Sequence, residues 1–367
     1  MATVTRENIG VLNDKIIVKV AREDYISSFE KSLKNFSKSA NIPGFRKGMV
    51  PTGMIKKLHG QAVFTDEVLK TVEKELTKYM DNEKLDIFAQ PLPLAENDAR
   101  SLDVNNPQEY SFGFEVGLKP EFSLPDLAQE VLPLYKVQVS DEMITQQIER
   151  IQNGHRKKKD PDGGIEDENI EKPELNEEFF KAVFPGKEIT TEEGFREEVK
   201  KDMEAYYERE AKNHLQHEIY HRLLEHTHIE FPENFLRRWL EVGSEKAKTP
   251  EEVEKEYPGF INQLKWSLIT EKISTEQKLE VTPDDIRESA KKQLFGYMGM
   301  QGLGDDQPWV DEYLNKMMQD RKFIDDTFYR IRAEKIFEWA EEQVQREEKQ
   351  VSEEEFGNEL KKHEHHH

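Results

Sequence analysis

The chain has 367 residues, which is enough for two or three domains of ordinary size and excludes a single small module. Charged residues make up 35% of it, and 75 acidic against 53 basic side chains give a net charge of −22, which excludes uniform binding to nucleic acid. The sequence has no cysteine, so disulfide frameworks, thiol catalysis and cysteine-ligated metal sites are excluded as well.

The N-terminal region predicts one compact α+β domain over residues 1–115. Apolar residues alternate along 11–20 and 110–118, which is typical of half-buried strands. Between them, apolar residues recur at helical spacing and predict two amphipathic helices. Their apolar positions are Ile26, Phe29, Leu33, Phe36 and Ala40 in the first helix and Val63, Val68, Val72, Leu76 and Tyr79 in the second.

Residues 116–153 predict an extended connector followed by a short helix. Pro120, Pro125 and Pro133 favour an extended chain. Ser140 is placed as an N-cap, and the helix behind it is expected to end at Gly154. The next segment, 154–175, is almost entirely polar and predicts a linker.

Residues 176–362 predict a set of long helices with narrow apolar stripes. Such helices usually form arms or bundles rather than a ball. The stripes begin at Phe195, Phe235, Val253, Ile286 and Val310, and the last is expected to run unbroken to Val344. The predicted fold class is therefore an α+β N-terminal domain followed by a mostly α-helical, elongated C-terminal domain with helical arms. Residues 363–367 (HEHHH) are interpreted as a tail or a tag remnant.

One segment reverses the acidic balance of the chain. Between Lys31 and Thr65 there is no Asp or Glu, and the segment holds Lys31, Lys34, Lys38, Arg46, Lys47, Lys56 and Lys57. Its centre is the loop 41–51 (NIPGFRKGMVP), where prolines and glycines favour an exposed turn. A phenylalanine beside two cations fits a phosphate-rich partner that also offers an apolar surface. The alternative is a solvated turn with a buried phenylalanine.

The loop GFRKGMVP at 44–51 resembles the ribosome-docking signature of the trigger factor family of bacterial nascent-chain chaperones. The likeness extends, in architecture, from VTRENIGVLNDKIIVKV through EYSFGFEVGLKPEF to the helical C-terminal region. It implies that Phe45, Arg46 and Lys47 contact the large ribosomal subunit, both ribosomal protein and rRNA, while Gly44 and Gly48 shape the turn. It also implies self-association of the free protein as a homodimer. The opening MATVTRENIG has no basic segment followed by an apolar one, so we expect a cytoplasmic protein.

Members of that family usually carry a peptidyl-prolyl isomerase domain after the connector. Here the segment 154–175 offers 22 residues, whereas an independent domain needs about 50 or more. We therefore expect the isomerase domain to be absent and the chain not to be an enzyme.

A competing motif is His217-Glu218-Ile219-Tyr220-His221, which satisfies the zinc-hydrolase pattern H-E-x-x-H. Catalytic zinc needs a third protein ligand in a dry cleft, and no downstream helix offers an obvious one. Incidental zinc or nickel binding by His214, His217 and His221 fits this charged helix better than catalysis does. We therefore expect no catalytic residues and no metal ligands.

Flexible apolar side chains gather between two of the C-terminal helices. Such groups suit promiscuous binding of unfolded polypeptides. The alternative is that Leu294 and Met298 only complete a helix stripe. The expected client-binding residues are Phe295, Tyr297, Met298, Met300 and Leu303.

Together these patterns predict an ATP-independent chaperone that docks on the ribosome near the exit tunnel and shields nascent or unfolded polypeptides. The sequence has no P-loop, and no cofactor is expected. The sequence contains no run of 18 uncharged apolar residues, so we expect no membrane partner. Two alternatives stay open: a zinc-dependent hydrolase using the HEIYH motif, and a non-catalytic helical scaffold protein.

Overall fold

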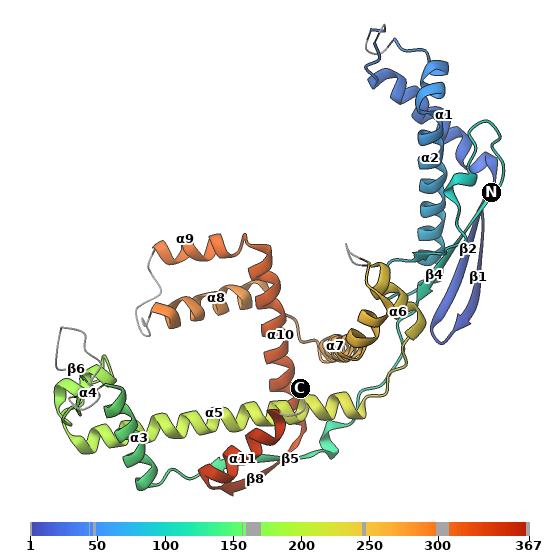
Figure 1. Ribbon diagram of the computed structural model, residues 1–367. Helices are drawn as coiled ribbons and strands as arrows, with labels where there is room; N and C mark the ends of the chain where they lie inside the picture. The colour runs from blue at the N-terminus through green and yellow to red at the C-terminus, as the bar shows by residue number, and fades with distance from the viewer. Residues whose placement is uncertain are drawn as a thin grey trace. The chain divides into compact units, whose positions relative to one another are not determined.

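The computed structural model describes residues 2–43, 45–46, 49–155, 157–158, 170–243, 247–298 and 308–364. It confirms the predicted fold class, with a small sheet near the N-terminus and a mostly helical remainder (Figure 1). The chain forms two compact units, each made of two separate segments. Unit one comprises Met1–Ser123 and His228–Lys265, and unit two comprises Leu124–Thr227 and Trp266–His367.

The sheet of unit one has four antiparallel strands in the order β1-β2-β4-β3. The predicted strands are β2 (Asn13–Val20) and β4 (Tyr110–Gly117), which pair over their whole length. The sheet also contains β1 (Thr3–Gly10), whose polar side chains gave no strand pattern, and the short β3 (Leu92–Pro93). The central position of β2 and β4 agrees with their apolar alternation, because both strands are largely buried.

Two helices, α1 (Arg22–Ser39) and α2 (Thr52–Glu83), confirm the predicted helical pair and cover the sheet (Figure 1). Phe64 of α2 is fully buried and meets Tyr25 and Phe29 of α1 edge-on, with ring centroids 5.4 and 5.2 Å apart. Edge-to-face aromatic packing of this kind stabilises a core beyond its buried area. The loop between the two helices is therefore connected at both ends to well-packed helices.

Unit one also contains α6 (Glu233–Val242) and the first part of α7 (Pro250–Glu276). Phe235 of α6 is fully buried, and its ring lies so close to Gly117 of β4 that a methyl group there would overlap it. Arg238 donates to Glu115 of β4 and to the Pro93 carbonyl. Residues 228–265 thus pack on the N-terminal sheet, although their helical pattern grouped them with the C-terminal helices.

In unit two, a parallel strand pair connects the beginning of the unit to its C-terminal part. The connector runs through the turn η2 (Leu127–Gln129) into β5 (Val131–Val137), which pairs in parallel with β8 (Gln345–Val351). Leu132 is buried, whereas β8 is polar and exposed. Strand β8 precedes the final helix α11 (Glu353–Glu364), whose Phe356 is buried at 5.7 Å from the Tyr135 ring.

Helix α3 (Asp141–Gly154) matches the predicted short helix, and the Ser140 hydroxyl accepts the Met143 N–H at 3.3 Å. It packs with α4 (Glu177–Val183) and α5 (Glu192–His226) around Phe180 and Phe195, whose rings stack 4.6 Å apart. In the predicted linker, two short strands, β6 (Lys157–Lys158) and β7 (Ile170–Glu171), pair antiparallel.

Helix α8 (Pro283–Met298) forms where the sequence predicts a helix. The single helix expected from Val310 to Val344 is wrong: it is divided into α9 (Pro308–Met317) and α10 (Arg321–Gln343). The break has a local cause, because the Asp320 carboxylate accepts the N–H groups of Lys322 and Phe323 and so begins a new helix.

Candidate functional site

The loop between α1 and α2 is anchored at both sides and exposed at its centre. Val50 is buried, and the Ser37 hydroxyl donates to its carbonyl at 2.5 Å. Backbone bonds from Phe45 N–H to the Ile42 carbonyl (3.1 Å) and from Met49 N–H to the Arg46 carbonyl (2.9 Å) close two turns. The loop therefore presents its central side chains from a hydrogen-bonded frame.

Of the five residues expected to dock on a ribosome, Phe45 and Arg46 are described and both are exposed, Phe45 to 36%. Gly44, Lys47 and Gly48 lie outside the described residues. The exposure of Phe45 disfavours the alternative in which this ring is buried under a solvated turn.

Apolar side chains on the loop and on the adjoining ends of α1 and α2 are exposed as well. Met49 is 71% exposed and Leu58 is 57% exposed, and Phe36 and Met54 are also open to solvent. The Phe36 ring lies 5.0 Å from the His59 ring of α2. We call these five residues, together with Arg46, the tip: Phe36, Phe45, Arg46, Met49, Met54 and Leu58. Its flexible methionines and aromatic rings suit an irregular partner surface.

Cations lie within and beside the tip and have no acidic partner in the described part of the chain. Six exposed ones are described, and none of them takes part in an ion pair there. Further along α2, by contrast, Lys70 binds Asp66 at 2.6 Å. Unpaired cations beside exposed apolar groups can neutralise phosphates while the apolar groups pack. The six are Lys31, Lys34, Lys38, Arg46, Lys56 and Lys57.

Three of the expected client-binding residues, Phe295, Tyr297 and Met298, fall at the end of α8. Leu294 is buried with Val310 and Leu314, and Phe295 is half-buried against this cluster. The backbones of Tyr297 and Met298 complete the helix, while Met300 and Leu303 lie outside the described residues. At Leu294, therefore, the stripe belongs to the core of unit two.

Other aromatic side chains of unit two are more exposed and were missed. Tyr329 of α10 is 65% exposed, Tyr206 of α5 48%, Tyr313 of α9 43% and Trp309 of α9 40%. Tyr329 lies off the apolar stripe in its part of α10, where an aromatic residue has no core to enter. Tyr206 follows Phe195, Val199 and Met203 at helical spacing, so the stripe predicts burial and gives no signal of its exposure.

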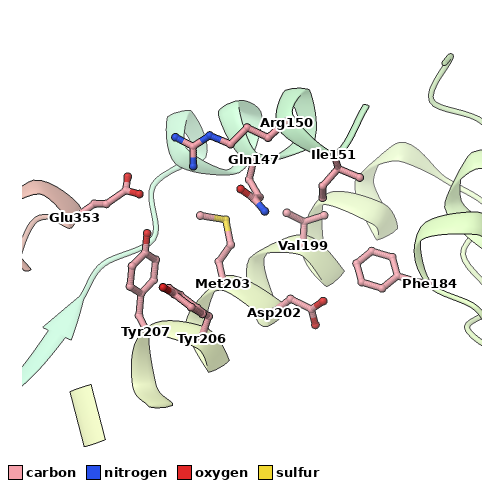
Figure 2. Close-up of a pocket in the computed structure, with 10 residues that line it drawn as sticks. All are labelled: Gln147, Arg150, Ile151, Phe184, Val199, Asp202, Met203, Tyr206, Tyr207 and Glu353. Carbon is pink, nitrogen blue, oxygen red and sulfur yellow. The ribbon is translucent and has the colours of Figure 1, made fainter. Parts of the chain in front are cut away.

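A pocket of about 380 Å³ lies between α3, α5 and α11 (Figure 2). Met203, Tyr206 and Tyr207 project into it from α5, and Arg150 and Glu353 stand at its rim (Figure 2). Burial, with a hydrogen bond to the Glu353 carboxylate, raises the pKa of Tyr207 to about 12. A mixed apolar and charged wall of this kind can hold one side chain of a bound polypeptide.

The HEIYH motif lies on α5, where Ile219 is fully buried and both histidines are half-buried. The Nε2 atoms of His217 and His221 are 3.3 Å apart. Across the described residues, no group of three or more His, Cys, Asp or Glu side chains is arranged to hold a metal ion. The third protein ligand of a catalytic zinc is therefore not found in that part of the chain.

Two family models match the chain. The model "Bacterial trigger factor protein (TF)" covers residues 2–151, and "Probable trigger factor, C-terminal domain" covers residues 211–360. The first spans the tip and the sheet, and the second spans most of the helices of unit two. The chain belongs to the trigger factor family. No isomerase domain occurs among these matches.

Relatives extend the likeness over most of the chain. The trigger factor of Chlorobaculum tepidum is 22% identical over 422 residues, covering 90% of this chain and 94% of that protein. That of Chlorobaculum parvum is 20% identical and covers 78% of this chain and 86% of the relative. The Treponema pallidum protein is 29% identical over 136 residues, which are 37% of this chain and 30% of the relative.

A solved structure gives the same fold. It comes from work on "promiscuous substrate recognition in folding and assembly activities of the trigger factor chaperone", and its TM-score is 0.57 at 14% identity. The match covers 93% of this chain and all of that one. None of the helices in the described ranges is long and apolar enough to cross a bilayer.

Proposed function

We propose that this trigger factor chaperone docks on the large ribosomal subunit through the tip and shields unfolded polypeptides without ATP. The observation that carries the docking proposal is the tip itself: exposed Phe45 and Arg46 on an anchored loop, between cations that have no acidic partner in the described chain. In a chain of net charge −22, this local excess of positive charge selects rRNA phosphate, and the apolar side chains pack on ribosomal protein.

Ribosome co-sedimentation tests the docking proposal. The variant Phe45→Ala/Arg46→Ala/Lys47→Ala should bind at least about tenfold more weakly, because two charge-assisted phosphate contacts and one apolar contact are lost. The matched control is Lys74→Ala/Lys78→Ala. It also removes two cations, but from the part of α2 that is remote from the loop. Equal losses in the two variants would show that net charge, and not the tip, drives binding.

Salt gives a second readout of the same proposal. Each phosphate contact contributes roughly 0.7–0.9 to the slope of log affinity against log salt concentration. Loss of Arg46 and Lys47 should therefore reduce the slope by between about 1 and 2, whereas Phe45→Ala alone should weaken binding and leave the slope unchanged. A slope that does not respond to Arg46→Ala/Lys47→Ala would contradict phosphate recognition by the loop.

Client shielding is proposed to use the exposed aromatic side chains of unit two with the end of α8. Exposed rings on an acidic frame bind unfolded segments while repulsion keeps the chaperone itself from aggregating. In an aggregation assay of an unfolded client without ATP, Tyr313→Ser/Tyr329→Ser should protect less at equal helix content. The variant Met298→Ser/Met300→Ser/Leu303→Ser tests the α8 end, and loss of fold in it would instead place these residues in the core.

We further propose that the chain acts without isomerase activity, in the cytoplasm, and as a homodimer when it is off the ribosome. The 22 residues of 154–175 are too few for an isomerase domain. A proline-limited refolding assay tests whether the chain has isomerase activity. Acceleration at substoichiometric concentration would overturn it.

A further inference from the structure

We propose that His217 and His221 form a chelating site for a divalent zinc ion on α5, separate from any catalytic role. Their Nε2 atoms lie 3.3 Å apart, and the ring centroids 4.4 Å apart. At hydrogen-bond distance one Nε2 donates its proton and the other accepts. When the donating ring carries its proton on Nδ1 instead, both Nε2 atoms have a lone pair, and a turn of the rings directs both lone pairs at one ion beside the line that joins the nitrogens.

The spacing suits zinc in particular. Zinc–nitrogen bonds of about 2.0–2.1 Å at the tetrahedral angle separate two nitrogen ligands by about 3.3–3.4 Å. The Nε2 atoms already lie 3.3 Å apart, so tetrahedral zinc requires no shift of the helix. A square-planar ion with bonds of similar length would need the nitrogens at about 2.8–3.0 Å, so the two rings would have to move closer together.

The surrounding packing holds both rings in place. Residues four apart on a helix share one face, so His217 and His221 lie on the same side of α5. On the opposite side, Ile219 and Leu223 are buried in the core. The Tyr220 ring contacts the His221 ring at 5.4 Å and the Trp266 ring at 4.7 Å. A rigid pair binds metal more tightly than two mobile imidazoles, because less freedom is lost on binding.

Two imidazoles leave the remaining zinc positions to water. Three protein ligands are the rule for catalytic zinc, so this site stabilises α5 rather than supplying a hydrolase. Because the ion binds the folded helix and not the unfolded chain, zinc should raise the unfolding temperature of unit two.

The terminal histidines would obscure the measurement, so the reference protein is the full chain with His363, His365, His366 and His367 replaced by alanine. Calorimetric titration with zinc chloride should give one ion per chain. Either His217→Ala or His221→Ala should lower the affinity about a hundredfold, because each leaves a single ligand. The matched control is His228→Ala, an exposed histidine outside the pair.

Two further measurements keep the result independent of folding. Cobalt added to the reference should give the visible absorption band of a tetrahedral ion, and His221→Gln, which retains a polar side chain, should abolish it. Zinc should raise the unfolding temperature of the reference and not that of His221→Gln. A reference that takes up no zinc, or uptake that is unchanged in both His217→Ala and His221→Ala, would overturn the proposal.

Discussion

The contact between Gly117 of β4 and Phe235 of α6 predicts a strong coupling between these two positions. A methyl group at Gly117 would overlap the Phe235 ring, and that ring is fully buried. Gly117→Ala should therefore cost about 1–3 kcal/mol by overpacking. Phe235→Ala should cost about 3–5 kcal/mol through lost burial and the cavity that remains.

The double variant separates this steric cause from a general intolerance of side chains in β4. Once the ring is gone, the Gly117 methyl enters vacant space, so Gly117→Ala should cost less than about 0.5 kcal/mol in the Phe235→Ala background. The interaction energy of the cycle is then about 1–3 kcal/mol. Gly53→Ala is the control, because nothing lies within 4 Å of a methyl group there.

Urea unfolding followed by Trp239 fluorescence measures the cycle in unit one. Trp239 is the only one of the four tryptophans in that unit, so replacing Trp266, Trp309 and Trp339 with phenylalanine leaves a local reporter. Trp239 lies on α6 with its ring 6.0 Å from the Phe260 ring. If Gly117→Ala costs the same in both backgrounds, α6 does not pack on β4 and the composition of unit one is refuted.

Three further predictions concern unit two. Hydrogen bonds from Lys335 and Thr282 hold the pKa of Asp285 at about 2, below its ordinary 3.8, so the stabilisation is present above pH 3.8 and is lost as pH falls toward about 2; Asp285→Asn should remove this acid dependence of helix content. Burial raises the pKa of Tyr207 from 10.0 to about 12, so its stabilisation is present below pH 10 and is lost as pH rises toward about 12; the Tyr207→Phe difference spectrum in an alkaline titration should show this late ionisation. Ser140→Ala removes the N-cap of α3 and should cost about 1 kcal/mol in urea unfolding, whereas Ser39→Ala, at the end of α1, should cost less.

Sequence patterns predicted the elements whose own side chains enter a core. The alternation in β2 and β4 and the stripes of α1, α2 and α5 record burial directly, so they were found. Strands β1 and β8 are polar and exposed, and they exist because a neighbouring strand supplies the hydrogen bonds. Nothing within the segments 3–10 or 345–351 marks them as strands.

The candidate site divides in the same way. The tip could be predicted because unusual residues, a run of cations and a Gly- and Pro-rich loop, are adjacent in the sequence. The exposed rings of Tyr206, Tyr313 and Tyr329 are scattered over three helices, and exposure depends on what packs around each one. The placement of 228–265 in unit one was missed because a helical stripe shows which face is buried but not against what.

The parallel pairing of β5 with β8 has a consequence for how this chaperone is itself made. Residue 131 finds its partner only when residue 345 has been synthesised, so the pair closes over more than half of the chain. Unit one likewise cannot be completed until residues 228–265 are synthesised, because Phe235 in that segment packs on β4. Contacts between distant residues form late during synthesis and slow folding. Unit one can therefore close once residue 265 has been synthesised and released, whereas unit two can close only when nearly the whole chain has emerged.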